Sequence, residues 1–331
     1  MRTMEETRKK LLGLFALASI IAASTSTALA ADPWPSKMVH FVVPTAAAGG
    51  PDRVARVLAD RLSKKWGVPV VVENRPGAAL LVGTEHVAKS APDGYTYLLT
   101  FSTHVQAPFL FRNLRFDPIK DFAAVTQTVS VDTVIAVRAD SPHRTLNDFI
   151  KAAKEANQPL TYGSNGQGST FHLYGEALAK AGGVKLLHVP YKGEAQALGG
   201  LLGNEIESSF GTLSTMLPMI RTGKVRALAV AGPDRTPVMP ELPTFPELGV
   251  PQLNVRGWFG MLAPAGTPIN IVKRVSADVA EVLRTPDVEK SLADQGLRPA
   301  YSTPEEFSAR IASDFEMWRT LIQQAGVKPQ E

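Results

Sequence analysis

Short apolar runs alternate with amphipathic segments along this chain from residue 39 onward. The runs that we expect to form strands are rich in aliphatic, β-branched or aromatic residues and lie at 39–43, 68–73, 95–100, 134–137, 159–162, 185–190, 206–210, 225–230 and 259–263. The segments that we expect to form helices begin near 52, 81, 145, 171, 194, 214, 268 and 304. This alternation is typical of α/β proteins.

Polar residues at the expected helix starts support these boundaries. Asp52 is placed to cap the first helix. Thr145 and Asp148 match a capping box, as do Thr303 and Glu306 near the end of the chain. The sequence therefore predicts where several helices begin as well as that they exist.

Residues 1–30 have the three-part pattern of a secretory signal peptide. Basic residues at 8–10 precede an apolar stretch at 11–23, which is too short to span a bilayer, and Ala28–Leu29–Ala30 provides a small-residue cleavage site. We expect a mature chain that begins at Ala31. The alternative interpretation is a buried N-terminal helix.

Composition narrows the cellular setting. The sequence contains no cysteine, so an exported form would have neither disulfides nor a cysteine-linked lipid anchor. We therefore expect a soluble protein of the periplasm. The formal net charge of +4 falls to +2 without residues 1–30, and no basic cluster with interleaved aromatic residues indicates nucleic-acid binding.

Motifs for catalysis, cofactors and metals are missing from the sequence. Gly166 and Gly168 would need a third glycine at 171 to form a dinucleotide fingerprint, and Phe171 stands there. No nucleophile elbow or zinc-protease motif occurs, and no two histidines have metal-ligand spacing. We expect a binding protein without cofactor or metal, while a hydrolase or isomerase that uses Ser169 and His172 remains the enzymatic alternative.

The segment from Tyr162 to His172 is the strongest binding signal in the sequence. A short strand leads through a glycine-rich polar loop into a helix that places Phe171, Tyr174 and Leu178 on one apolar face. Free backbone N–H groups and the positive end of a helix dipole favour an anion at such a corner. This pattern predicts binding of a small carboxylate.

Motifs along the whole chain resemble one known family. They are Pro35–Lys37, Val42–Pro44, Gly49–Asp52, Ala55–Arg56, Val71–Ala78, Ala91–Thr96, His188–Gly193, Gly223–Val230 and Trp258–Pro268. In this order they resemble the extracytoplasmic solute receptors of tripartite tricarboxylate transporters, also called Bug-type receptors.

The resemblance implies a two-domain periplasmic binding protein fold (type II-like), in which two crossover strands join mixed sheets flanked by helices. Domain 1 would comprise residues 31–133 and 257–331, and domain 2 residues 134–256. The crossover strands would be Val134–Ala139 and Arg256–Ala263. The family also implies a cleft that closes on an organic acid.

The partner implied by the family is a membrane permease of one large and one small subunit, and we expect the receptor itself to be a monomer. A sensory receptor for a histidine kinase is the alternative to transport.

Loops that follow strands supply the candidate ligand-binding residues, because open α/β sheets bind ligands at the carboxyl ends of their strands. The residues that match the family's loops, or follow the corresponding strands, are Thr45, Ala47, Gly49, Ser102, Thr103, Ser164, Asn165, Ser169, Thr170, Tyr191, Gly211 and Thr212. His104 could contact ligand with the third loop. His172 could either donate a proton to a ligand carboxylate or cap a neighbouring loop. We expect Trp258 and Phe259 to belong to the hinge and core.

Departures from the family pattern bear on the ligand. The family often has Phe-Asp where this chain has Phe210–Gly211, so a carboxylate that could meet a ligand ammonium is missing from that position. Phe101 and Phe171 suggest an apolar pocket. The sequence thus favours a dicarboxylate without an amino group, with an aliphatic or aromatic body.

Overall fold

Two β-sheets organise the chain. The computed structural model describes residues 34–327 and 329, and the expected signal peptide lies outside these residues. The first sheet has the order β11-β4-β10-β3-β1-β2. Its strands are β1 (Val39–Val43), β2 (Val70–Asn74), β3 (Thr96–Phe101), β4 (Phe122–Val131), β10 (Gly257–Pro264) and β11 (Leu297–Pro299).

The second sheet is built from the middle of the chain and has the order β7-β6-β8-β5-β9. Its strands are β5 (Thr133–Arg138), β6 (Leu160–Ser164), β7 (Leu186–Pro190), β8 (Ser208–Thr212) and β9 (Val225–Val230). Both sheets contain parallel and antiparallel neighbours: β1 is parallel to β2 and β3, whereas β5 is antiparallel to β8 and β9. The expectation of mixed sheets in an α/β protein is confirmed.

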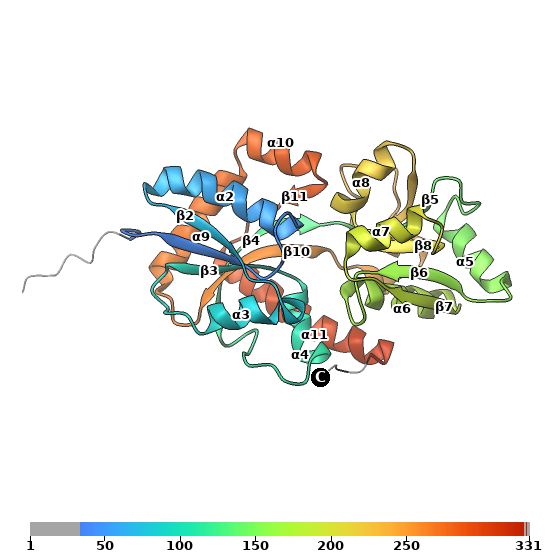
Figure 1. Cartoon of the computed structure of the whole chain (residues 1–331), viewed down its shortest axis with the longest axis horizontal. Helices are drawn as coiled ribbons and strands as arrows, with labels where there is room; N and C mark the ends of the chain where they lie inside the picture. The colour runs from blue at the N-terminus through green and yellow to red at the C-terminus, as the bar shows by residue number, and fades with distance from the viewer. Residues whose placement is uncertain (1–33, 328, 330–331) are drawn as a thin grey trace, which may run out of the picture. The chain divides into compact units, whose positions relative to one another are not determined.

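Helices flank each sheet (Figure 1). Those of the first sheet are α2 (Gly50–Trp66), α3 (Leu81–Ala88), α4 (Thr103–Leu110), α9 (Ile269–Leu283), α10 (Pro286–Asp294) and α11 (Pro304–Ala325). Those of the second are α5 (Leu146–Glu155), α6 (Thr170–Gly182), α7 (Glu194–Leu202) and α8 (Leu213–Arg221). No helix among residues 34–327 is long and apolar enough to cross a bilayer.

The chain passes between the sheets at two places (Figure 1). It leaves the first sheet at Asp132, between β4 and β5, and returns to it through residues 254–256, before β10. The pairing places Phe101 opposite Phe259, and Thr212 opposite Thr133. The carboxyl ends of β3 and β8 therefore lie beside the two crossings.

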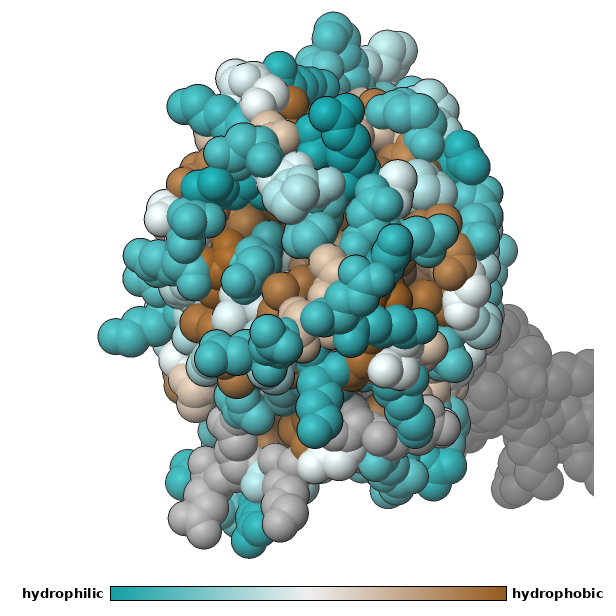
Figure 2. All heavy atoms as spheres, turned by 90° about the vertical axis from the view of Figure 1, so that its right-hand side faces the viewer, coloured by the Kyte–Doolittle hydropathy of each residue, from teal (hydrophilic) through white to brown (hydrophobic). Residues whose placement is uncertain are grey.

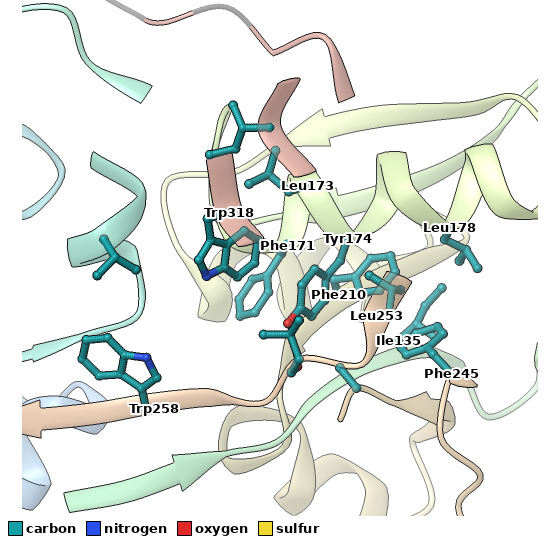
Figure 3. Close-up of a cluster of buried hydrophobic side chains, with 14 of the residues drawn as sticks. Ile135, Phe171, Leu173, Tyr174, Leu178, Phe210, Phe245, Leu253, Trp258 and Trp318 are labelled. Carbon is teal, nitrogen blue, oxygen red and sulfur yellow. The ribbon is translucent and has the colours of Figure 1, made fainter. Parts of the chain in front are cut away.

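The apolar core is continuous between elements of both sheets. Helix α11 packs on α4 and α6. Trp318 of α11 stacks on Tyr174 of α6 with ring centroids 6.0 Å apart, and Figure 3 shows both rings in the cluster with Phe171 and Phe210. Trp258 is buried in β10 and donates from its indole nitrogen to Asp314, so its predicted role in core packing is confirmed.

Four elements were missed by the hydrophobic pattern. Strand β4 alternates small and hydroxyl residues with few large apolar ones, yet Thr126 and Thr128 are buried because their hydroxyls donate to the carbonyls of Ser302 and Phe259. Helix α4 carries an internal proline, and β11 is only three residues long. Helix α10 follows α9 after only two residues, and the apolar pattern did not reveal it as a separate helix.

The predicted helix caps are mostly correct. Thr145 and Thr303 form the expected capping boxes with Asp148 and Glu306. The prediction for Asp52 is wrong: Gly49 occupies the N-cap of α2, and the Asp52 carboxylate instead accepts from the backbone N–H of Ala48.

A buried ion pair joins the two crossings. Arg256 Nε lies 2.7 Å from Asp132 Oδ1, and the Asp132 side chain is completely buried. The same guanidinium donates to the side chain and carbonyl of Asp234. The carbonyl of Asp132 accepts from the N–H of Leu213 at the start of α8, so this residue also fixes the neighbouring helix.

Replacing Arg256 by methionine is expected to destabilise the protein by about 3–5 kcal/mol, because it leaves the Asp132 carboxylate buried without its closest cation. Urea unfolding monitored by circular dichroism measures this. The matched control is Arg138→Met, which removes the partner of the exposed Asp140 and is expected to cost less than about 1 kcal/mol. Equal costs for the two variants would contradict the assignment.

Candidate functional site

Two groups of strand-end loops border the crossings. After β1 and β3 come residues 44–49 and Ser102, and after β6, β7 and β8 come residues 165–169, 191–193 and the start of α8. Strand β6 is parallel to both β7 and β8, so the three loops of the second sheet are neighbours. Most of the predicted ligand-binding residues lie in these loops.

The glycine-rich loop is held by hydrogen bonds within itself and to His172. Ser164 Oγ accepts from the N–H of Gly166, and His172 Nδ1 accepts from the N–H of Gly168 at 3.0 Å. Ser169 N–H donates to the carbonyl of Gly166. The expectation that these amides are free is therefore wrong, because the loop uses them to keep its own shape.

Two amides at the start of α6 remain as candidate anion donors. Within the described residues, the N–H groups of Thr170 and Phe171 make no hydrogen bond, as expected for the first turn of a helix. Ser169 is the N-cap and accepts from the N–H of His172. Asn165 is exposed on the loop. The anion-binding capacity of this corner thus lies at the helix start rather than around the whole loop.

Two stacked histidines, His172 and His188, contact the glycine-rich loop. The rings of His172 and His188 lie 4.0 Å apart, and His188 Nε2 is 2.6 Å from Ser164 Oγ. Burial lowers the pKa of His172, and burial together with His172 lowers the pKa of His188 to about 4. Both imidazoles are therefore neutral at pH 7. Of the two roles considered for His172, the structure shows the loop cap.

Thr170 connects the loop to the first sheet's helices. Its hydroxyl lies 2.9 Å from Nε2 and 3.1 Å from Oε1 of Gln106, which is buried in α4. The Thr170 side chain, predicted to contact ligand, is thus committed to a contact between α4 and α6.

The loop after β1 contributes exposed backbone. The Thr45 hydroxyl is buried without a hydrogen-bond partner, whereas Ala47 is exposed and Gly49 half-buried. The N–H groups of Ala47 and Gly49 form no hydrogen bond with described residues. Burial opposes the ionisation of Asp52, but hydrogen bonds from Arg56, Ala48 and Asn74 outweigh it and hold the pKa of Asp52 below its ordinary value. This carboxylate fixes the loop.

Two of the three candidate residues after β3, Ser102 and His104, form hydrogen bonds within the protein. Ser102 Oγ accepts from the N–H of Trp258, and Thr103 is half-buried at the start of α4. His104 is fully buried among aromatic rings and bonded to the carbonyl of Pro118, so it does not reach the loop surface.

The two phenylalanines expected to make the pocket apolar lie in different surroundings. Phe101 packs edge-on against Phe259, whose ring lies under Gly50. These rings place an apolar surface beside the loop after β1. Phe171, in contrast, is buried in the core cluster shown in Figure 3, so its expected place in the pocket is wrong.

The remaining predicted ligand-binding residues are Tyr191, Gly211 and Thr212. The polar groups of Tyr191 and Thr212 form hydrogen bonds within the protein. The Tyr191 hydroxyl donates to Glu205, which precedes β8, rather than to the strand-end loops. Thr212 donates from both its N–H and its hydroxyl to Glu194 Oε2, at 3.0 and 2.7 Å. Gly211 is buried beside them.

Three residues that form hydrogen bonds at this site were not predicted from the sequence. Glu194 and Gln106 are polar residues near helix starts, and His188 lies within a strand. The only sequence signal for Glu194 was an acid directly after Gly193 at a predicted helix start. Their partners come from other elements, which spacing along the chain does not reveal.

A surface hollow of about 590 Å³ lies elsewhere, at the opposite ends of β5 and β9. Its lining includes Arg144, Ile220, Arg226 and Leu248. Figure 2 views the molecule from the side of the second sheet and shows hydrophobic side chains scattered among hydrophilic ones. Because the strand-end loops are at the other edge, the hollow is not part of the candidate site. Within residues 34–327, no cluster of three acidic or histidine side chains could hold a metal.

Comparison with known proteins identifies relatives over nearly the whole chain. Residues 54–327 match the family described as tripartite tricarboxylate transporter family receptor. The periplasmic binding protein BugD is 34% identical, with a TM-score of 0.79 over 90% of this chain and 100% of its own.

Two further solved structures contain bound acids. Rpa4515 of R. palustris with adipate is 31% identical, with a TM-score of 0.82 over 90% of this chain and 100% of its own. MatC from Rhodopseudomonas palustris with bound malate is 30% identical, with a TM-score of 0.76 over 87% and 100%.

Because of the buried neutral histidines, we expect the stability of the folded protein to fall at acidic pH. Because the folded protein holds the pKa of His188 at about 4, below the ordinary value of about 6.5, the unfolded chain binds more protons between these pH values. The corresponding stability is complete above about pH 6.5 and is lost as the pH falls toward 4. We expect the drop in unfolding temperature between pH 7 and pH 4.5 to be smaller in His188→Gln than in the wild type.

The control for this measurement is His143→Gln, which replaces a half-buried histidine away from the loop. It is expected to keep the acid sensitivity of the wild type. If His188→Gln keeps it as well, the buried neutral imidazole does not contribute to the pH dependence.

Proposed function

This chain belongs to the tripartite tricarboxylate transporter receptor family, and on that premise we propose that it binds a small dicarboxylate between its two groups of strand-end loops. The resemblance predicted from sequence is confirmed. The family consists of non-catalytic periplasmic binding proteins, so the prediction that the chain is not an enzyme is also confirmed.

The observation that carries the proposal is the convergence of loops at the crossings. The start of α6 and the loop after β1 each offer backbone N–H groups without a partner in the described chain, and they come from different sheets. Adipate and malate, bound by two relatives, each carry two carboxylates. Two donor sets suit two carboxylates, and helix starts favour anions.

The crossings also suggest where the protein bends. We propose residues 31–133 with 257–331 as one domain and residues 134–256 as the other. The boundaries fall beside Asp132 and Arg256, which pair with each other. A ligand that contacts loops of both domains favours the closed form by its differential affinity.

Delivery of the acid to a tripartite transporter is the corresponding biological role. We propose that residues 1–30 direct the chain to the periplasm and that the closed receptor presents its surface to a permease of one large and one small subunit.

Asn165→Ala tests the binding site. Asn165 is exposed on the glycine-rich loop, so the change is expected to leave the unfolding temperature unchanged. We expect the affinity for adipate or malate to fall about tenfold, because one hydrogen bond to a charged group is lost. Isothermal titration calorimetry measures the affinity.

The control is Asn147→Ala, which truncates an exposed asparagine on α5, away from the strand-end loops. It is expected to bind like the wild type. Wild-type affinity in Asn165→Ala would remove this residue from the site, and failure of every diacid to bind the wild type would overturn the proposal.

Export is tested by the mass of the protein recovered from the periplasm of an expressing Gram-negative host. We expect a mature chain that begins at Ala31, because the preceding Ala28–Leu29–Ala30 fits signal peptidase. Full-length protein retained in the cytoplasm would contradict the prediction.

A further inference from the structure

The carboxylate of Glu194 occupies the end of β8. Its Oε2 accepts from both the N–H and the hydroxyl of Thr212. The Thr212 hydroxyl is also 3.0 Å from Ser214 Oγ and from Thr215 Oγ1. Glu194 comes from the first turn of α7, which packs on β6 and β8. A set of donors that could receive a ligand carboxylate is therefore already filled by the protein's own anion.

This placement corrects the argument made from Gly211. The sequence suggested that no carboxylate stands at the end of β8, because glycine replaces an acidic residue there. An ideal Cβ built on Gly211 would lie only 3.8 Å from Glu194 Oε2. The acidic group is therefore present at this position, delivered by α7 instead of β8, and the reason for excluding an amino-bearing ligand no longer holds.

Glu194 has no cationic partner in the described part of the chain. Among the residues that the structure describes, none forms an ion pair with this carboxylate, and Oε1 has no hydrogen-bond donor. The side chain is half-buried and Oε1 is not enclosed. A half-buried carboxylate with an open oxygen favours a hydrogen-bond donor or a cation and repels another carboxylate.

We propose that Glu194 is a specificity-determining residue that accepts a hydrogen bond from a donor on the body of the ligand. The inference rests on the proposed function. Glu194 directly follows the loop after β7 and bonds Thr212 at the end of β8, which is parallel to β6. Its carboxylate therefore lies at the same edge of the second sheet as the start of α6, where the proposal places one ligand carboxylate. The receptor then prefers a diacid with a hydroxyl or an ammonium group to the plain diacid of the same length.

Two series of acids distinguish the kinds of donor. We expect malate and aspartate to bind wild-type protein about tenfold or more tightly than succinate, and the same order for 2-hydroxyglutarate and glutamate over glutarate. Preference for the amino acids over the hydroxy acids assigns an ammonium as the donor, and the reverse assigns a hydroxyl. Calorimetry at pH 7 with the full mature chain gives all six affinities.

Glu194→Gln tests the residue itself. Glutamine keeps an oxygen that Thr212 can bond but removes the charge, so we expect most of the preference for an ammonium to be lost while the affinity for the plain diacid stays equal or rises. Glu205→Gln is the matched control, since that carboxylate bonds Tyr191 instead of Thr212. It is expected to keep wild-type selectivity. Thermal unfolding verifies that both variants are folded.

The outcomes separate this inference from the proposed function. Equal binding of plain and substituted diacids, or unchanged selectivity in Glu194→Gln, would overturn the role of Glu194 and leave a dicarboxylate receptor. Failure of all six acids, and of adipate, to bind the wild type would overturn the proposed function.

Discussion

The ion pair between Asp132 and Arg256 joins the two segments that the candidate site borders. Each residue lies in one of the two segments that connect the sheets, and the pair is shielded from water. A buried charge is costly unless it is paired, so the ion pair favours the arrangement in which the two segments lie side by side. Since the strand-end loops border these segments, the same interaction contributes to the placement of the loops.

Helix α11 and the start of α6 add a second connection between the sheets. Tyr174 stacks on Trp318 and donates to the carbonyl of Val255, while Thr170 bonds Gln106. All of these contacts reach α6, whose first turn carries the candidate anion donors. A movement between the sheets would therefore change contacts at the start of α6. If the proposed ligand binds there, these contacts connect binding to the proposed movement of the domains.

The sequence predicted the strands and helices with clear apolar periodicity, and it identified the glycine-rich loop through its unusual composition. It missed β4, whose buried Thr126 and Thr128 are satisfied by carbonyls distant in the chain. At the site, the sequence located the loops, but it did not reveal which of their N–H and hydroxyl groups form hydrogen bonds within the protein. Whether the Gly168 amide is free depends on the ring of His172, and whether Thr212 is free depends on Glu194. Such pairings are made by packing, which local spacing does not encode.

The internal bonds of the glycine-rich loop have a consequence for recognition. The amides that donate to Ser164 and His172 are not available to a ligand, but their hydrogen bonds hold the loop in one conformation before a ligand binds. A preformed loop loses little conformational entropy on binding, which favours affinity. In the proposed site, the few amides left free would suffice for one carboxylate but would not distinguish between acids that differ elsewhere. In the proposed receptor, discrimination between acids of similar length would then depend on side chains around the loop, and Glu194, which bonds Thr212 at the end of β8, is the residue proposed for this role.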